Sequence, residues 1–124
     1  MSNYFYCSAA SNLAEKLCTL TAFQGLHLDN SGAEANECAI KVARKYSFDK
    51  YGAERNEIIT LNNSFHGRTV TTLSATGQDV FHNYFFPFTQ GFSYVDANDM
   101  NALENAVTDK TCAVMLELIQ ARAV

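Results

Sequence analysis

The chain has 124 residues, 48% of them hydrophobic and 18% charged, which is the composition of one folded domain rather than of a disordered chain. Its formal net charge of −4 at pH 7 argues against nucleic acid and anionic membranes as partners. No apolar run approaches the roughly 20 residues of a membrane-spanning helix, and the first residues lack the apolar core of a secretion signal, so we expect a cytoplasmic protein.

The first predicted helix begins near residue 12. Asn12–Glu15 has the pattern of a capping box, and three leucines then recur at helical spacing. Gly25 is expected to close this helix, because glycine readily terminates helices. The apolar segment Leu26–Asp29 follows at once and is a candidate for a short strand.

The second predicted helix begins at a turn of small residues. Ser31, Gly32 and Ala33 come directly after the candidate strand, and Glu34 completes a second capping box. Apolar residues then recur with the period of a helix. The expected apolar face consists of Ala35, Cys38, Ala39, Val42, Ala43 and Tyr46.

The rest of the chain alternates strands with helices. The predicted elements are strands at Glu57–Leu61, Phe92–Asp96 and Cys112–Ile119 and short helices near Thr69–Ala75 and Asp99–Val107. Residues 76–91 hold many aromatic side chains and the only proline, so we expect a long loop that packs by its rings. The alternation predicts one α/β domain over residues 1–124, without an internal boundary, built on a mainly parallel sheet with flanking helices. Ligands of such sheets bind at the carboxyl ends of the strands.

The turn at Ser31–Ala33 has the properties of an anion site. The first amides of a helix have no partner within the helix and carry a partial positive charge, so they can hold a phosphate. Gly32 lets the backbone come close to a ligand, Ala33 adds little bulk, and Ser31 can either cap the helix or bind a phosphate oxygen. A well-capped helix without any ligand explains the same residues, so the turn alone leaves both explanations open.

A second candidate loop follows the strand Glu57–Leu61. The face of Phe65 can stack on a planar ring, and the guanidinium of Arg68 can pair with both oxygens of a carboxylate. His66 lies between them, and Gly67 would let the backbone bend sharply. The alternatives are a core phenylalanine, a structural histidine and a solvated arginine.

The cysteines and histidines give no sign of a metal site. The four cysteines form no Cys-x-x-Cys pair, and with so large an apolar fraction we expect four reduced thiols. The histidines have no metal-ligand spacing to one another or to a cysteine. The residues concerned are Cys7, Cys18, Cys38, Cys112, His27, His66 and His82.

Three segments of the sequence resemble one known family. These segments, NSGAEANECAIKVARKY, FHGRT with TLSATGQ, and AVMLELIQ, are similar to class III (fold type I) aminotransferases that depend on pyridoxal 5′-phosphate. The resemblance covers essentially the whole chain and is greatest to members that act on N-acetylornithine. It implies transfer of an amino group from N-acetylornithine, or a related ω-amine, to 2-oxoglutarate. It also implies a homodimeric enzyme, with this chain as part of its large cofactor-binding domain.

The resemblance assigns roles to residues by position. The cofactor phosphate would be held by Ser31, Gly32 and Ala33, and the pyridine ring would stack on Phe65, with His66 and Gly67 adjoining. Arg68 matches the arginine that receives a substrate carboxylate. Glu117 and Gln120 match the first glutamate and the glutamine of the family's E-P-I-Q-G-E segment, of which the glutamate lies near the cofactor.

The sequence also departs from the family pattern. Leu118 replaces a proline, and the chain has Ala121-Arg122-Ala123-Val124 where the family has Gly-Glu-Gly-Gly, so the family's second glutamate is missing. No lysine here matches the lysine that holds the cofactor, and the aspartate that pairs with the pyridine nitrogen would also come further along. We therefore expect a fragment without catalytic residues that is inactive alone. The alternative is a non-catalytic truncated α/β chain that binds at most phosphate compounds or the cofactor.

Overall fold

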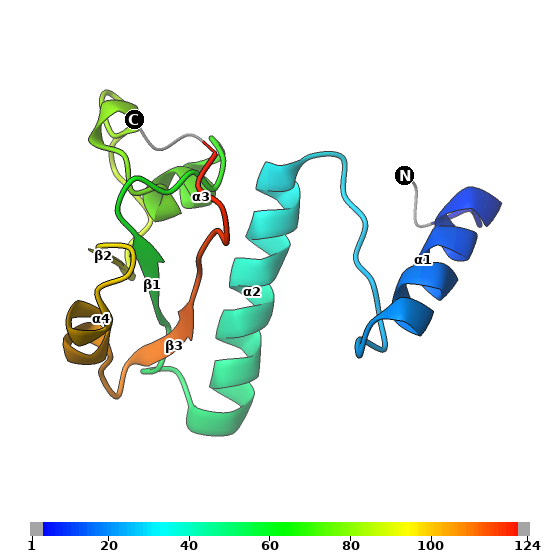
Figure 1. Ribbon diagram of the computed structural model, residues 1–124, viewed down its shortest axis with the longest axis horizontal. Coiled ribbons are helices and arrows are strands. Elements are labelled where there is room, and N and C mark those ends of the chain that lie inside the picture. The colour runs from blue at the N-terminus through cyan, green and yellow to red at the C-terminus, as the bar shows by residue number, and fades with distance from the viewer. Residues whose placement is uncertain (1–3, 122–124) are drawn as a thin grey trace.

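The computed structural model describes residues 4–121 and contains a three-stranded parallel sheet, with α2 (Gly32–Tyr51) between this sheet and α1 (Ser8–Leu20) (Figure 1). The strands are β1 (Glu57–Leu61), β2 (Phe92–Val95) and β3 (Thr111–Val114), in the order β2-β1-β3. β1 pairs in parallel with both neighbours, and a register shift interrupts its pairing with β3 near Glu57. The predicted α/β fold with a parallel sheet and helices is confirmed.

Helices pack next to both outer strands of the sheet. Helix α2 (Gly32–Tyr51) packs beside β3, whereas α4 (Met100–Ala106) packs beside β2. The short helix α3 (Val70–Ala75) contacts both α2 and β2. The hydrophobic core lies where these elements meet: Ile40, Ile58 and Ala75 are buried, and Phe92, Cys112, Ala113 and Met115 pack against them.

Helix α1 (Ser8–Leu20) differs from its prediction at both ends. It begins four residues before Asn12, and its N-cap, Cys7, makes no side-chain cap hydrogen bond. The alanines that follow Ser8 are strong helix formers and extend the helix past the capping-box pattern. The helix ends at Leu20 and its C-cap is Thr21, so Gly25 is not the stop signal. Figure 1 shows α1 standing apart from the sheet, and none of its residues is buried.

The prediction of a strand at Leu26–Asp29 is wrong. The segment is part of the connection from α1 to α2 and forms no ladder with β1, β2 or β3. A strand needs a hydrogen-bonded neighbour, and the described strands pair only with one another. The local order comes instead from an ion pair of 2.7 Å between His27 Nε2 and Asp29 Oδ2.

The last strand is shorter than predicted. β3 ends at Val114, and the remaining residues of Cys112–Ile119 leave the sheet without strand geometry. The amide of Met115 still donates to the carbonyl oxygen of Ile59 at 2.8 Å. Beyond that point β1 offers few further partners, because it ends at Leu61.

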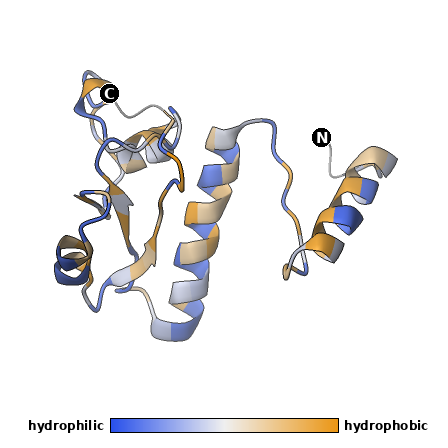
Figure 2. Cartoon of the chain, viewed as in Figure 1, coloured by the Kyte–Doolittle hydropathy of each residue, from blue (hydrophilic) through white to orange (hydrophobic). Residues whose placement is uncertain are grey.

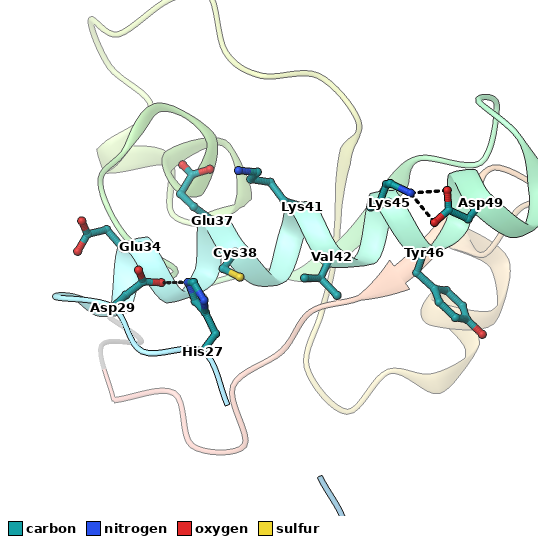
Figure 3. A pocket seen from close by; sticks show the side chains of 10 residues that line it. All are labelled: His27, Asp29, Glu34, Glu37, Cys38, Lys41, Val42, Lys45, Tyr46 and Asp49. Carbon is teal, nitrogen blue, oxygen red and sulfur yellow. Dashed lines mark hydrogen bonds and ion pairs between the residues drawn. The ribbon is translucent and has the colours of Figure 1, made fainter. Parts of the chain in front are cut away.

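The face of α2 toward the sheet also differs from its prediction. The buried residues of this helix are Ile40 and Ser47, neither of which was in the predicted apolar face. Val42 and Tyr46 are 61% and 55% exposed. They lie with Cys38 on the side of α2 that faces His27 and Asp29 (Figure 3), and Ala35 and Ala39 are exposed as well. Hydrophobic positions occur on more than one side of α2 (Figure 2), so periodicity alone could not choose between them.

The aromatic loop at residues 76–91 was predicted in outline. It contains one short 3-10 turn, Asp79–Phe81, and an isolated parallel bridge between Gly77 and Asn62, and otherwise has no regular structure. Its rings pack in part as expected: Phe86 and Phe88 lie 4.8 Å apart, and Phe81 contacts Phe65 at 5.6 Å between ring centroids. Tyr84 is 91% exposed, so the packing does not include every ring.

The structure also bears on the cysteines and on membrane-spanning helices. All four cysteines are free, as predicted. Among residues 4–121, none of the helices combines the length and the apolar character that crossing a bilayer requires.

Candidate functional site

The structure brings the two sequence-predicted loops together at the start of α2. A cavity of about 450 Å³ lies between them, at the end of the helix nearest the exit of β1. Its lining residues are Gly32, Ala33, Asn36, Phe65, His66, Gly67, Arg68 and Thr69. Six of the eight predicted site residues therefore line one cavity. Ser31 directly precedes Gly32, and Glu117 accepts a hydrogen bond from the amide of Phe65.

Ser31 is the N-cap of α2. Its side-chain oxygen accepts a hydrogen bond from the amide of Glu34 at 3.3 Å, and its hydroxyl donates to Glu34 Oε2 at 3.0 Å. Within the described residues the hydroxyl thus serves the helix, as the capping explanation requires. The amides of Gly32 and Ala33 occupy helix positions that have no acceptor inside the helix. These two amides are therefore the donors that remain for an anion.

The space beside Gly32 is open. A Cβ atom added there would meet no atom of the protein within 4 Å, and the backbone of Gly32 is helical. Neither packing nor backbone strain therefore requires glycine at this position. A bound phosphate would explain why the position is bare, because the ligand would occupy the space that a side chain would fill.

The loop from Phe65 to Gly67 is held by three different elements. The amide of Phe65 donates to Glu117 Oε2 at 2.9 Å, from the segment that follows β3. The amide of His66 donates to Thr76 Oγ1 at 3.0 Å, at the end of α3. The carbonyl oxygen of His66 accepts from Asn36 Nδ2 at 2.8 Å, from α2. The backbone of this loop is therefore fixed before any ligand binds.

Gly67 is the point of closest contact between the loop and α2. Its φ angle is 128°, and a Cβ added there would lie 2.7 Å from both Ala33 Cβ and Thr72 Oγ1. Only glycine fits this conformation and this space. The sharp bend expected at Gly67 is present, and it brings the loop into close contact with Ala33 at the start of α2.

Phe65 and Arg68 differ in how firmly they are held. The Phe65 ring is half-buried and packs against Phe81 in an edge-to-face arrangement. Arg68 is exposed and makes no hydrogen bond or salt bridge to another residue of the described chain. Its guanidinium can therefore turn toward a carboxylate without breaking an internal contact.

His66 is buried, but its ring is not fully satisfied. The residue is 4% exposed, and its Nε2 atom has no hydrogen-bond partner among the described residues. Burial lowers the pKa of this histidine below its ordinary value of 6.5, and the carboxylate of Glu117 opposes the shift in part. The ring is therefore neutral at pH 7, and a ligand group could supply the missing partner.

Stability should decrease in mild acid because of His66. The unfolded chain takes up a proton at this residue near pH 6.5, whereas the folded chain does so only at lower pH. Between these two pKa values the unfolded state holds more protons, so the free energy of unfolding falls as the pH falls through this window. The variant His66→Gln should remove this part of the pH dependence. Urea unfolding of both proteins from neutral to acidic pH checks it, and equal slopes would contradict the assignment.

The sequence did not identify Asn36 or Thr76 as site residues. Both act through hydrogen bonds to His66, across 30 and 10 positions of the chain. A short polar side chain on the sheet-facing side of α2, one turn before Ile40, is the only local signal for Asn36. Glu117 was predicted by position, and its contact is with the backbone of the loop.

The sequence is similar to one family of known proteins. The sequence matches the family "Aminotransferase class-III" over residues 1–123. Acetylornithine aminotransferase of Haemophilus ducreyi is 53% identical over 120 residues, which are 96% of this chain and 30% of that protein. The enzyme of the same name from Methanocaldococcus jannaschii is 49% identical over 119 residues, again 96% of this chain and 30% of the relative.

Solved structures resemble the same part of such enzymes. The ornithine aminotransferase of Toxoplasma gondii superposes with a TM-score of 0.87 at 32% identity, covering 97% of this chain and 29% of that one. The description of that structure reports partial occupancy of PLP at its active site. The chain thus spans about 30% of the length of the relatives that it matches.

Proposed function

The chain belongs to the class-III aminotransferases, and from this premise we propose that the protein that carries it moves an amino group from N-acetylornithine, or a related ω-amine, to 2-oxoglutarate. Pyridoxal 5′-phosphate is the cofactor of this family. We propose further that residues 1–124 form a single part of the large domain, and that the whole protein is a cytoplasmic homodimer. The relatives named acetylornithine aminotransferase support the choice of substrate.

One observation carries this proposal. The start of α2 and the loop from Phe65 to Arg68 line the same cavity, so donors for a phosphate, an aromatic ring and a guanidinium face one space. A capped helix alone would explain Ser31, but it would not explain why the buried His66 Nε2 is unsatisfied within the described chain. Arg68, which lines the same cavity, is exposed and is available to a carboxylate. Together these features fit a cofactor that has a phosphate and a planar ring, bound next to a substrate that has a carboxylate.

The residues present fit the phosphate of the cofactor. The amides of Gly32 and Ala33 are the donors, and the helix start adds a partial positive charge. Gly32 leaves the space open, since a Cβ there meets nothing within 4 Å. Ser31 holds the first turn in shape by capping Glu34, so the donors are already oriented.

The same residues fit the ring and the substrate. Phe65 would cover one face of the pyridine ring, and Glu117 fixes Phe65 through its backbone amide. Arg68 would bind the substrate carboxylate. When bound, the cofactor supplies an electron-withdrawing ring that stabilises negative charge at the carbon next to the amino group. The residues of this chain would hold the phosphate, orient the ring and cover one of its faces. No lysine is among the residues that line the cavity.

Turnover by the full-length protein that carries this chain tests the activity. With the cofactor present, we expect glutamate to form from 2-oxoglutarate faster with N-acetylornithine than with ornithine or 4-aminobutyrate. Absence of glutamate with all three amines would overturn the proposed function. Sedimentation of the same preparation should give the mass of a dimer.

A titration of the 124-residue chain tests its own role. Nitrogen-15 amide signals of Ser31, Gly32, Ala33 and Phe65 should shift saturably with pyridoxal phosphate, and at lower concentrations than with inorganic phosphate. No turnover should accompany this binding. A folded chain whose signals do not move at these residues would show that residues 1–124 do not form the cofactor site alone.

Arg68→Lys should weaken substrate binding in the full-length protein. A lysine keeps the charge but cannot pair with both carboxylate oxygens, so KM for N-acetylornithine should rise roughly 10- to 100-fold, with a smaller change in kcat. An amine without a carboxylate is the control, because its turnover should be unaffected. An equal loss with both amines would place Arg68 elsewhere than at the substrate carboxylate.

A further inference from the structure

Asn36 makes a contact that spans the candidate site. It lies one turn into α2, on the same side as the buried Ile40, and its side chain is partly buried. Its Nδ2 atom donates to the carbonyl oxygen of His66 at 2.8 Å. Asn36 also lines the cavity itself. A single amide side chain therefore connects the helix that offers the phosphate donors to the loop that offers the ring.

The contact controls the peptide unit between His66 and Gly67. The amide of His66 donates to Thr76 Oγ1, and the same hydroxyl donates to the carbonyl oxygen of Gly67 at 3.3 Å, so these bonds hold the residues on either side. The carbonyl oxygen of His66 itself is held by Asn36. Phe65 precedes this peptide unit and Arg68 follows it. A change in its orientation would move both side chains relative to the amides of the helix start.

A second contact from α2 holds the far end of the loop. Glu37 Oε1 accepts a hydrogen bond from Thr69 Oγ1 at 2.5 Å. Neighbouring residues of α2, Asn36 and Glu37, thus contact the loop on both sides of Arg68. The Glu37 contact is exposed, whereas that of Asn36 is partly buried and should contribute more to the position of the loop.

We propose that Asn36 is a positioning residue that sets the spacing between the phosphate donors of α2 and the ring of Phe65. This inference rests on the proposed function, because it assumes one ligand that has both a phosphate and a ring. The inference adds to the proposed function a specific statement about selectivity. The site discriminates between the cofactor and a bare phosphate through a side chain that contacts the loop rather than the phosphate.

The variant Asn36→Ala in the full-length protein tests the proposal. Loss of one partly buried hydrogen bond should weaken pyridoxal phosphate binding about tenfold. Inorganic phosphate contacts the helix start only, so its affinity should change by no more than about twofold. The visible circular dichroism per bound cofactor should also decrease, because it reports how the ring is oriented. A residue with a merely structural role would lower the melting temperature without changing this signal.

Two further variants serve as controls. Asn56→Ala removes an exposed amide that donates to the carbonyl oxygen of Ala53 at 2.7 Å, before the start of β1 and at the opposite end of that strand from the site, and should change none of these measurements. Asn36→Gln keeps an amide donor and should recover part of the affinity and of the dichroism. The proposal would be overturned if Asn36→Ala lowered the affinities for phosphate and for cofactor equally, or if it changed neither affinity.

A measurement without cofactor separates this inference from the proposed function. The amide of Gly67 belongs to the same peptide unit as the carbonyl of His66, so its nitrogen-15 signal should shift in Asn36→Ala and remain unchanged in Asn56→Ala. If the unmodified protein binds no cofactor, the proposed function fails whatever this signal does. The positioning role alone is overturned if the unmodified protein binds cofactor but Asn36→Ala changes neither the amide signal of Gly67 nor the visible circular dichroism of the bound cofactor.

Discussion

Gly67→Ala should lower the free energy of unfolding by roughly 2–5 kcal/mol, from the combined cost of a strained backbone and an overpacked contact. The φ angle of Gly67 is 128°, a value that residues with a side chain rarely adopt. The new Cβ would lie 2.7 Å from Ala33 Cβ and from Thr72 Oγ1, and Thr72 cannot move far because it is fully buried. Unfolding in urea, followed by circular dichroism, measures the change.

Gly25→Ala is the matched control for this experiment. Gly25 has no atom within 4 Å of its added Cβ and no positive φ angle, so the same methyl group should change stability by less than about 0.5 kcal/mol. Similar unfolding midpoints for the two variants would contradict the close contact between the loop and α2. Because the loop is in close contact with Ala33 at Gly67, we also expect replacement of Gly67 to widen the cavity and to lower the affinity for every ligand of the site.

The sheet and the position of the site could be predicted because their determinants are local. The strand Glu57–Leu61 has the same bounds in the structure as in the prediction, since its buried apolar run and the polar loop after it lie next to each other in the sequence. The turn at Ser31 and the loop at Phe65 were each recognised from a few consecutive residues. The carboxyl end of β1 places the loop at Phe65, as expected for an α/β sheet. The turn at Ser31 follows no strand, and the packing of α2 against that loop brings it there instead.

The features that could not be predicted depend on distant partners. Leu26–Asp29 has the composition of a strand, but strand formation requires a neighbour that none of the described strands supplies. Likewise, α2 carries more than one set of apolar residues, and contact with β3 and α3 decides that Ile40 rather than Val42 is buried. The bond from Asn36 to His66 spans 30 residues and leaves no periodic signal.

Gly32→Ala should have opposite effects on binding and on stability. A methyl group forced against a bound anion costs about 1–3 kcal/mol, which corresponds to a loss of affinity for phosphate and cofactor of roughly 5- to 150-fold. The protein itself has room for the methyl group, since nothing lies within 4 Å of it. Alanine is also the better helix former, so the free energy of unfolding should stay constant or rise by up to about 1 kcal/mol.

The opposite signs distinguish a binding role from a folding role at this turn. If Gly32 serves only the helix start, as the capping of Glu34 by Ser31 would allow, alanine would stabilise the fold and leave phosphate affinity unchanged. Calorimetric titration with phosphate and urea unfolding of the same variant decide between the two. Gly67→Ala should lose both stability and affinity, and Gly25→Ala neither. A loss of affinity without loss of stability is therefore specific to a residue whose missing side chain makes room for a ligand.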